Sequence, residues 1–251
     1  MEREPVIIYE NKDFLILNKP SGLQMHPARI NAGKLRRAAA QKHEDRGKIQ
    51  PTLVDWLLEH YPEVKTVGDD PATRPGIVHR LDKDTSGIMV VPKNQKTFEH
   101  LKALFQKHEV KKTYLALVVG TPKNKTGVID APIGIKNGTL KRSVNATKMV
   151  KPAVTEYKVL EEFRKNDGEM YSLLEVSPRT GRTHQIRVHL ASIGHPIVGD
   201  KLYGKHAQPA FAHRLMLHAK SLVFSDDGGN RFAFDVEPPN GFRDVSAIST
   251  G

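Results

Sequence analysis

The sequence predicts an α+β fold built on a mixed, largely antiparallel β-sheet with flanking helices. Strand-like segments outnumber helix-like segments, and the two kinds do not alternate strictly as they do in a doubly wound sheet. No internal repeat is present. A chain of 251 residues is long enough to bury a sizeable core, and we expect one domain over residues 1–251.

Short apolar or β-branched runs between turn residues mark the predicted strands. These runs cover residues 6–9, 14–17, 88–91, 114–119, 154–160, 171–176, 221–224 and 232–236. The run at 88–91, Ile-Met-Val-Val, is apolar throughout and predicts a buried strand.

Two helices are predicted where a capping residue precedes an apolar stripe. Thr52 begins the first helix, which continues to Tyr61 and ends at Pro62. Asn94 begins the second helix. The stripe of this second helix is formed by Phe98, Leu101, Leu104 and Phe105.

A third helix is predicted after Gly181, which breaks the preceding strand, with Thr183 as the N-cap. Its inward stripe, at i, i+4 and i+7, consists of Ile186, Leu190 and Ile193. The residues that end this helix are Gly194 and Pro196.

The composition bounds the partners and the chemistry. Lys and Arg number 39 against 28 Asp and Glu, so the net charge of +11 favours nucleic acid first and an anionic membrane surface second. The absence of cysteine excludes disulfides, thiolate metal sites and cysteine nucleophiles. No apolar run approaches the roughly 20 residues that a bilayer requires, and the charged start lacks a signal-peptide core. We therefore expect a cytoplasmic protein with no membrane partner.

A basic insertion at about residues 28–50 interrupts the pattern of strands and helices. It contains seven Lys or Arg residues against Glu44 and Asp45 alone, with few bulky apolar side chains. Such a segment cannot pack much of a core. It is either a solvated loop or an arm that orders on RNA.

Two polar, glycine-containing stretches are the candidate chemical sites. The first, 75–87, leads into the buried strand and contains Asp82, while Asp84 is better explained as a turn residue. The second, 177–190, places Arg179 and Arg182 beside the start of the third helix, where backbone N–H groups favour a phosphate. The alternative for these arginines is a solvated positive surface.

Asp82 is the candidate catalytic carboxylate. To act as a nucleophile or base at neutral pH it must stay ionised while partly desolvated, and a paired guanidinium achieves this. Arg187 faces inward one turn into the third helix and is a plausible partner. The three histidines 184, 189 and 195 do not share a helical face or match a zinc-protease spacing, so we predict no metal site; a histidine-dependent metal nuclease is the opposing hypothesis.

Several sequence motifs, given below with their positions, resemble those of the RluA-type RNA pseudouridine synthases. The strongest are HRLDKDTSG at 79–87 and TGRTHQIRVH at 180–189 with GHPIVGD at 194–200. Weaker ones are NKPSG at 18–22, KTYLA at 112–116 and LHA at 217–219. The likeness extends from about residue 6 to residue 239 and is greatest to an RluD-like catalytic domain without an N-terminal small RNA-binding domain.

The resemblance implies a pseudouridine synthase fold with a central catalytic cleft, and an isomerase that needs neither metal nor cofactor. It implies that Asp82 is the catalytic aspartate, that Tyr114 stacks on the target base, and that Arg187 forms a salt bridge with Asp82. A core aromatic is the alternative for Tyr114. The side chains expected to contact RNA are Arg80, His79, Arg179, Arg182, His184 and Lys112.

The RNA target is the least determined prediction, because target choice depends on peripheral contacts. We expect a monomer that acts on structured RNA, ribosomal rather than transfer RNA. The alternatives are a synthase for transfer RNA and a catalytically silent RNA-binding or ribosome-assembly protein on the same scaffold.

Overall fold

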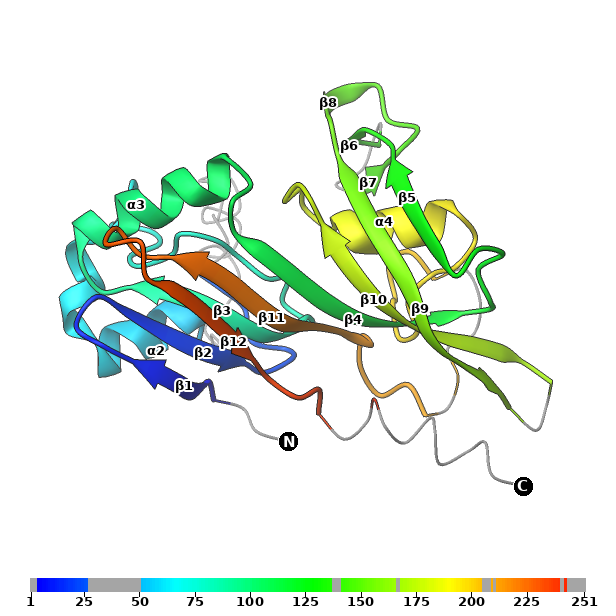
Figure 1. Ribbon diagram of the computed structural model, residues 1–251, viewed down its shortest axis with the longest axis horizontal. Helices are drawn as coiled ribbons and strands as arrows, with labels where there is room; N and C mark the ends of the chain where they lie inside the picture. The colour runs from blue at the N-terminus through cyan, green and yellow to red at the C-terminus, as the bar shows by residue number, and fades with distance from the viewer. Residues whose placement is uncertain are drawn as a thin grey trace, which may run out of the picture.

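The computed structural model describes residues 4–26, 51–136, 141–165, 168–204, 209, 211–239 and 242. A nine-stranded sheet runs through the whole molecule (Figure 1) in the order β1-β2-β3-β11-β4-β10-β9-β5, with β12 paired to β11. Its strands are β1 (Val6–Glu10), β2 (Phe14–Lys19), β3 (Ser86–Pro92), β4 (Lys111–Val119), β5 (Thr126–Asp130), β9 (Val154–Arg164), β10 (Met170–Pro178), β11 (Leu217–Ser225) and β12 (Arg231–Asp235). Among the described strands only β3 and β11 pair in parallel, so the predicted largely antiparallel sheet is confirmed.

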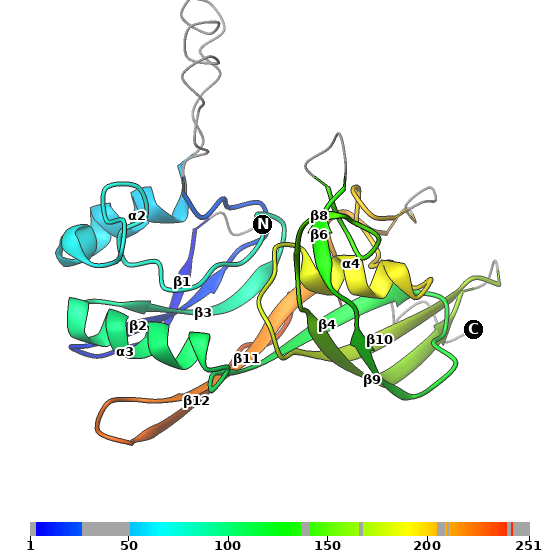
Figure 2. The same cartoon turned by 90° about the horizontal axis from the view of Figure 1, so that it is seen from above.

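The part of the sheet that contains β2 and β3 is covered on both faces (Figure 2). Even-numbered side chains of β2 and β3, such as Phe14 and Val90, pack with Leu101 of α3 (Gln95–Gln106). Odd-numbered side chains pack instead with α2 (Leu53–His60) and the short 3-10 helix η1 (Pro62–Thr66). This alternation follows from the two-residue period of a strand and explains why β3 is buried along its whole length.

The predicted caps of the first two helices are confirmed. Asp55 N–H donates to Thr52 Oγ1 at 3.3 Å, and the Asp55 carboxylate accepts the Thr52 N–H at 2.7 Å, which is a capping box. Asn94 Oδ1 accepts the Thr97 N–H at 2.9 Å. Pro62 begins η1 directly after α2 ends.

The second half of the sheet packs on α4 (Gln185–Ser192). Residues 185–190 are all buried, including Arg187 and His189, so α4 is covered on every side rather than along one stripe. Two predictions about this helix were wrong. Its N-cap is His184 in the left-handed conformation, not Thr183, and Ile193 lies outside the helix and is exposed.

The two halves meet where β3 lies beside β11. Gly87 is required there, because a Cβ at this position would lie 2.2 Å from the Ala219 carbonyl oxygen, and its φ is +119°. Ser86 Oγ lies 2.8 Å from His218 Nδ1 and accepts a hydrogen bond from Arg214 at 2.6 Å. These buried contacts hold the start of β3 against the C-terminal part of the chain.

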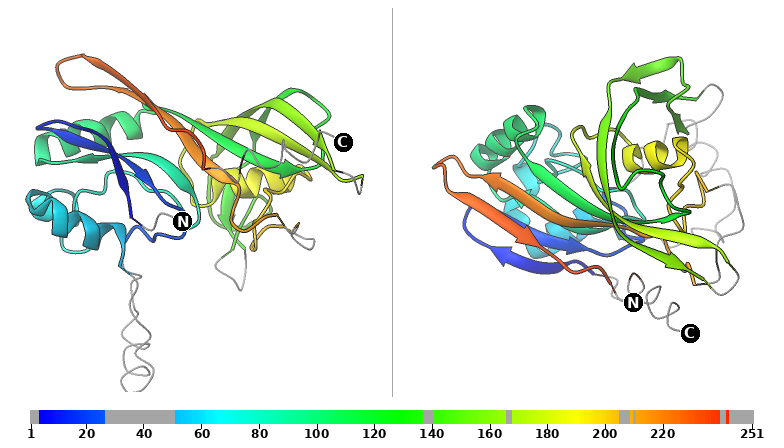
Figure 3. Two further views of the ribbon diagram at one scale, coloured as in Figure 1. Left: turned by 90° about the horizontal axis from the view of Figure 1, so that it is seen from below. Right: turned by 45° about the vertical axis from the view of Figure 1, so that its right-hand side comes forward.

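A small second sheet stands over α4 (Figure 3). Its strands are β6 (Ile133–Ile135), β7 (Arg142–Ser143) and β8 (Lys148–Lys151), in the order β7-β6-β8. Ile133 and Ala153 pack on Val188 of α4, whereas Met149 and Val150 are exposed. Neither this sheet nor β5 was predicted.

All eight predicted strands are present with slightly different ends. The predicted basic insertion at 28–50 lies outside the described residues. No helix in the described part of the chain has both the length and the apolar character needed to cross a bilayer.

Candidate active site

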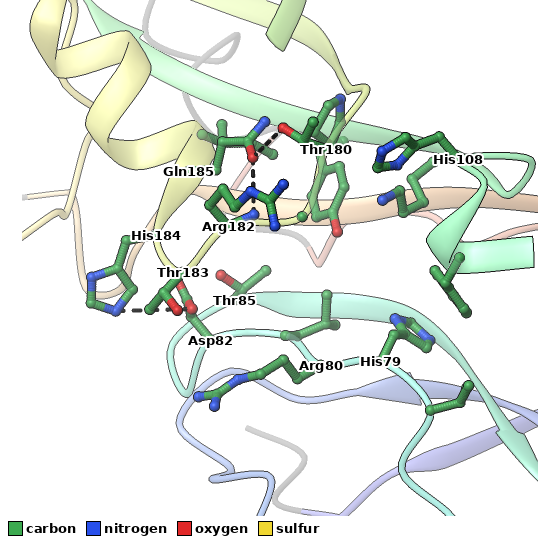
Figure 4. Close-up of a pocket in the computed structure, with 18 of the residues that line it drawn as sticks. His79, Arg80, Asp82, Thr85, His108, Thr180, Arg182, Thr183, His184 and Gln185 are labelled. Carbon is green, nitrogen blue, oxygen red and sulfur yellow. Dashed lines mark hydrogen bonds and ion pairs between the residues drawn. The ribbon is translucent and has the colours of Figure 1, made fainter. Parts of the chain in front are cut away.

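A cleft of about 570 Å³ separates two walls of the molecule (Figure 4). One wall is the segment 78–85 before β3, together with the end of α3. The other wall is the segment 178–187 that connects β10 to α4. The volume lies within the range of about 300–1,000 Å³ that small-molecule sites occupy. The first wall is called the Asp82 wall below, and the second the α4 wall.

Asp82 lies in the Asp82 wall and lines the cleft, with 17% of its side chain exposed. Its carbonyl accepts the Thr85 N–H at 3.2 Å, which closes a turn into β3. The resemblance placed Asp82 in the active site, and the structure brings it into the cleft with the other two residues of that set, Tyr114 and Arg187.

A buried lysine supports this wall from behind. Lys19 Nζ donates to the carbonyls of Pro20, Leu23 and Lys83, at 2.8, 2.9 and 3.0 Å. Three carbonyls match the three N–H bonds of an ammonium group. Burial lowers the pKa of Lys19 to about 7, against the opposite effect of the Asp84 carboxylate. Lys19 therefore ties the NKPSG motif to the residue that follows Asp82.

His79 is held in the same wall by a hydrogen bond and by ring stacking. Its Nε2 accepts the Val90 N–H at 3.0 Å, and its ring stacks on Phe105 with centroids 4.6 Å apart. Burial lowers the pKa of His79 to about 3, so the ring is neutral. The neutral ring lines the cleft, and the contact of His79 with RNA stays a prediction.

The α4 wall is held together by Gln185. Its side-chain oxygen accepts hydrogen bonds from Thr180 Oγ1 at 2.7 Å and from the Arg182 N–H at 2.9 Å. Its amide nitrogen donates to the Val154 carbonyl and to Thr155 Oγ1, both at 3.0 Å. The Arg182 N–H is thus already used within the wall, and the expectation that the start of the helix binds a phosphate stays a prediction.

Arg187 joins two carboxylates. Its Nε and Nη2 donate to Asp200 at 2.8 and 2.9 Å, and its Nη1 donates to Asp82 Oδ2 at 3.3 Å. Burial alone would lower the pKa of Arg187, but Asp200 and Asp82 raise it above its usual value. Burial likewise opposes ionisation of Asp200, yet Arg187 holds the pKa of Asp200 below its usual range. The guanidinium is therefore charged and fixed beside Asp82.

Tyr114 lies on β4 between β10 and β11, opposite Val176 and Ala219. It is half-buried, lines the cleft and packs against both large cores. Burial and the Asp82 charge both raise the pKa of Tyr114, so its phenol is protonated at neutral pH.

Most of the other predicted RNA contacts line the cleft, and one does not. Arg80 is exposed at its edge, and Lys112, Arg182 and His184 lie along its walls. Arg179 lies outside the cleft and forms an exposed ion pair with Glu156.

Two important residues were missed by the sequence analysis. Asp200 is the main partner of Arg187, and Tyr203 lies under the guanidinium, 5.2 Å from its carbon to the ring centroid. Asp200 belongs to the GHPIVGD motif, which was the only available signal.

The three histidines considered as metal ligands have separate partners. His184 Nδ1 lies 2.9 Å from Tyr203 Oη, His189 Nδ1 lies 2.8 Å from Thr155 Oγ1, and His195 Nδ1 lies 3.0 Å from a backbone carbonyl. Within the described ranges, no three His, Cys, Asp or Glu side chains are grouped to hold a metal ion.

Comparison with known proteins identifies the family. The model of the RNA pseudouridylate synthase family matches residues 13–192. An uncharacterized RNA pseudouridine synthase of Aquifex aeolicus is 37% identical over 247 residues, which cover 95% of this chain and 71% of that protein. The ribosomal large subunit pseudouridine synthase D of Nitrosomonas europaea is 41% identical over 204 residues, 79% of this chain and 49% of that protein. The chain thus spans about half the length of this second relative.

A solved structure agrees with these matches. Human RNA Pseudouridylate Synthase Domain Containing 1 superposes with a TM-score of 0.73 at 26% identity, over 98% of this chain and 88% of that one. The predicted pseudouridine synthase fold and the resemblance to RluA-type enzymes are confirmed. The family match covers most of the cleft residues, and together with the Aquifex relative it shows that this chain belongs to the RNA pseudouridylate synthase family.

Proposed function

We propose that this chain isomerises uridine to pseudouridine in large-subunit ribosomal RNA, with Asp82 as the catalytic carboxylate. The observation that carries the proposal is the Asp82–Arg187 contact of 3.3 Å inside a cleft lined by both long motifs. Ribosomal RNA is preferred to transfer RNA because the Nitrosomonas relative carries a ribosomal large subunit name.

The reaction requires a carboxylate that stays ionised in a partly closed site. The bond between the base nitrogen and the sugar breaks, the uracil turns, and a ring carbon joins the sugar and loses its proton. Attack on the sugar, attack on the ring and removal of a sugar proton all begin with an ionised Asp82. Arg187 places a positive charge 3.3 Å from Oδ2 of this carboxylate.

Tyr114 is proposed to receive the flipped base. A uracil inside a base stack cannot reach Asp82, so the nucleotide must turn out at a cost of a few kcal/mol. Stacking on an aromatic ring returns about 1–3 kcal/mol. The protonated phenol of Tyr114 is also a proton donor or relay close to Asp82.

The positive side chains of the cleft are proposed to hold the RNA backbone beside the flipped nucleotide. Arg80, Lys112 and Arg182 line the cleft, and Lys112 also lies 5.8 Å over the Phe105 ring. Burial lowers the pKa of Lys112, and an RNA phosphate would favour its charged form.

The test compares Asp82→Asn with Asp84→Asn, which removes an exposed carboxylate two residues away. Each protein is incubated with large-subunit ribosomal RNA and transfer RNA transcripts, and pseudouridine is mapped by carbodiimide treatment and primer extension. Asp82→Asn should lower the rate by about 10³-fold or more while RNA affinity is retained, and Asp84→Asn should stay active.

Each alternative predicts a different result. Product only on transfer RNA would replace the ribosomal target. RNA binding without product from the unaltered chain would favour a silent RNA-binding protein, and product from Asp82→Asn would end the role assigned to Asp82.

A further inference from the structure

The two oxygens of Asp82 have different neighbours. Oδ2 receives the Arg187 hydrogen bond at 3.3 Å, whereas Oδ1 lies 3.9 Å from His184 Nε2. Figure 4 shows the His184 ring directed at Asp82 from the start of α4. A distance of 3.9 Å is too long for a hydrogen bond but close enough to become one after a small rotation, as catalytic contacts often do when substrate binds.

The Tyr203 hydroxyl determines which nitrogen of His184 carries the proton. This hydroxyl accepts the Arg142 N–H at 3.1 Å and lies 2.9 Å from His184 Nδ1. The Arg142 contact does not use the hydroxyl proton, so the hydroxyl can donate it to Nδ1. A neutral His184 then carries its proton on Nε2, the nitrogen that faces Asp82.

The backbone at His184 is strained in a way that supports this arrangement. His184 has φ 57° and ψ 21°, the left-handed region that residues with a Cβ rarely adopt. Such conformations cost about 1–3 kcal/mol and are concentrated at functional sites. The ring nevertheless packs edge-on against Tyr203, with centroids 5.7 Å apart and an interplanar angle of 77°.

We propose that His184, fixed by Tyr203, is a positioning residue that donates from Nε2 to Asp82 Oδ1 and sets the rotation of the carboxylate. The inference rests on the proposed role of Asp82. Arg187 and His184 then hold one oxygen each, and only Arg187 contributes a full charge.

The charges around His184 favour the neutral ring on balance. Asp82 from the Asp82 wall and Asp200 after α4 attract a proton, whereas Arg187 on α4 and Arg142 on β7 oppose it. Burial is the largest effect, and it lowers the pKa of His184 below its usual value. A neutral donor holds the carboxylate without forming a second ion pair.

Three variants test the proposal. His184→Asn suits the left-handed backbone but is too short to reach Asp82. His184→Gln places an amide donor near the position of Nε2. Tyr203→Phe keeps the ring under Arg187 and removes only the hydroxyl. His195→Asn is the matched control, because it makes the same substitution at a histidine whose ring contacts the Val119 carbonyl instead of Asp82.

Single-turnover rates with saturating RNA should fall about 10–100-fold in His184→Asn and Tyr203→Phe, with affinity and melting temperature nearly unchanged. His184→Gln should recover most of the rate, and His195→Asn should match the unaltered chain. The loss should appear in the rate and not in the RNA affinity, because His184 is proposed to act only through the rotation of the Asp82 carboxylate.

A readout that does not depend on activity separates this proposal from the function itself. In ¹⁵N-histidine-labelled protein at pH 7, His184 should show a protonated Nε2 and an unprotonated Nδ1, and Tyr203→Phe should weaken that preference. Protonation at Nδ1, or full activity in both His184→Asn and Tyr203→Phe, overturns the proposal. An unaltered chain that forms no pseudouridine overturns the proposed function instead, while the tautomer is still measured.

Discussion

The two walls of the cleft are held by different interactions. The Asp82 wall depends on side chains that bond to the main chain: Lys19 donates to three carbonyls, and His79 accepts one backbone N–H. The α4 wall depends more on bonds between side chains, as between Arg187 and Asp200 and between Thr180 and Gln185, although Gln185 also bonds to two main-chain groups. The position of Asp82 therefore depends on the path of the backbone, and the position of Arg187 depends mainly on its ion pair with Asp200.

Asp200→Asn should have the largest effect, because it breaks the interaction that positions the α4 wall. Removal of one partner from a buried pair costs about 3–5 kcal/mol, since it leaves the other charge uncompensated. We expect urea denaturation to report a loss of this size, together with a large fall in activity.

Asp235→Asn is the matched control for that change. Asp235 pairs with Lys220, but 69% of its side chain is exposed. Exposed pairs contribute about 0–1 kcal/mol, so this variant should remain near the unaltered stability. Equal losses in the two variants would contradict the assigned importance of the buried pair.

Acid should lower the stability of the fold through His218 and His79, whose rings are neutral in the folded chain. Burial lowers the pKa of His218, which braces Ser86, to about 4, and that of His79 to about 3. The unfolded chain binds these protons near pH 6.5 and the folded chain does not, so stability falls as the pH drops below 6.5. Each histidine contributes about 1.4 kcal/mol per pH unit. Unfolding measured between pH 7.5 and 4.5 should show this slope, and His218→Gln should reduce it; a flat profile would contradict the neutral, buried state of both rings.

Lys19→Met should lower stability by about 1–3 kcal/mol, because buried carbonyls lose their donor while the apolar length of the side chain is kept. Activity should also fall, since the Lys83 carbonyl directly follows Asp82. Lys83→Met is the control: that side chain is exposed, and only its main chain is used. Calorimetry and single-turnover rates measure both variants, and equal behaviour would exclude the bracing role of Lys19.

After Asp200→Asn, acid and Lys19→Met, the smallest effect is expected from Arg179→Ala. Its ion pair with Glu156 is exposed, so stability should change by less than about 1 kcal/mol. If Arg179 contacts RNA from outside the cleft, affinity should fall a few-fold, with a salt dependence shallower by about one charge. An unchanged salt slope would limit RNA contact to the cleft.

The sequence predicted the parts of the fold whose side chains are buried in a regular pattern. The strands of the large sheet and the first two helices have apolar faces and clear caps, as at Thr52 and Asn94. Strands β5 to β8 were not predicted, because apolar side chains such as Val128 and Met149 are exposed. No alternation of buried apolar and exposed polar residues therefore marks these strands. The left-handed N-cap at His184 was not predicted, because threonine is a more common N-cap residue than histidine and Thr183 directly precedes it.

The candidate site was predictable as far as motif and helix spacing extend. The inward direction of Arg187 suggested Asp82 as its partner, and the structure places them 3.3 Å apart. Asp200 was not predictable in its role, because it lies in a loop thirteen residues after Arg187 and belongs to no periodic element. The structural position of His79 also depends on a contact across the sheet, with Val90.

The order of strands has a consequence for synthesis on the ribosome. β11 lies between β3 and β4 in the sheet but follows both in the sequence, since it begins at Leu217 and β4 ends at Val119. A nascent chain that stops short of Leu217 has two open strand edges, and Tyr114 lacks its neighbour Ala219. Pairing over such long separations is slow and leaves unpaired edges exposed to aggregation. The cleft is therefore completed only after β11 has been synthesised and closes the gap between the two halves.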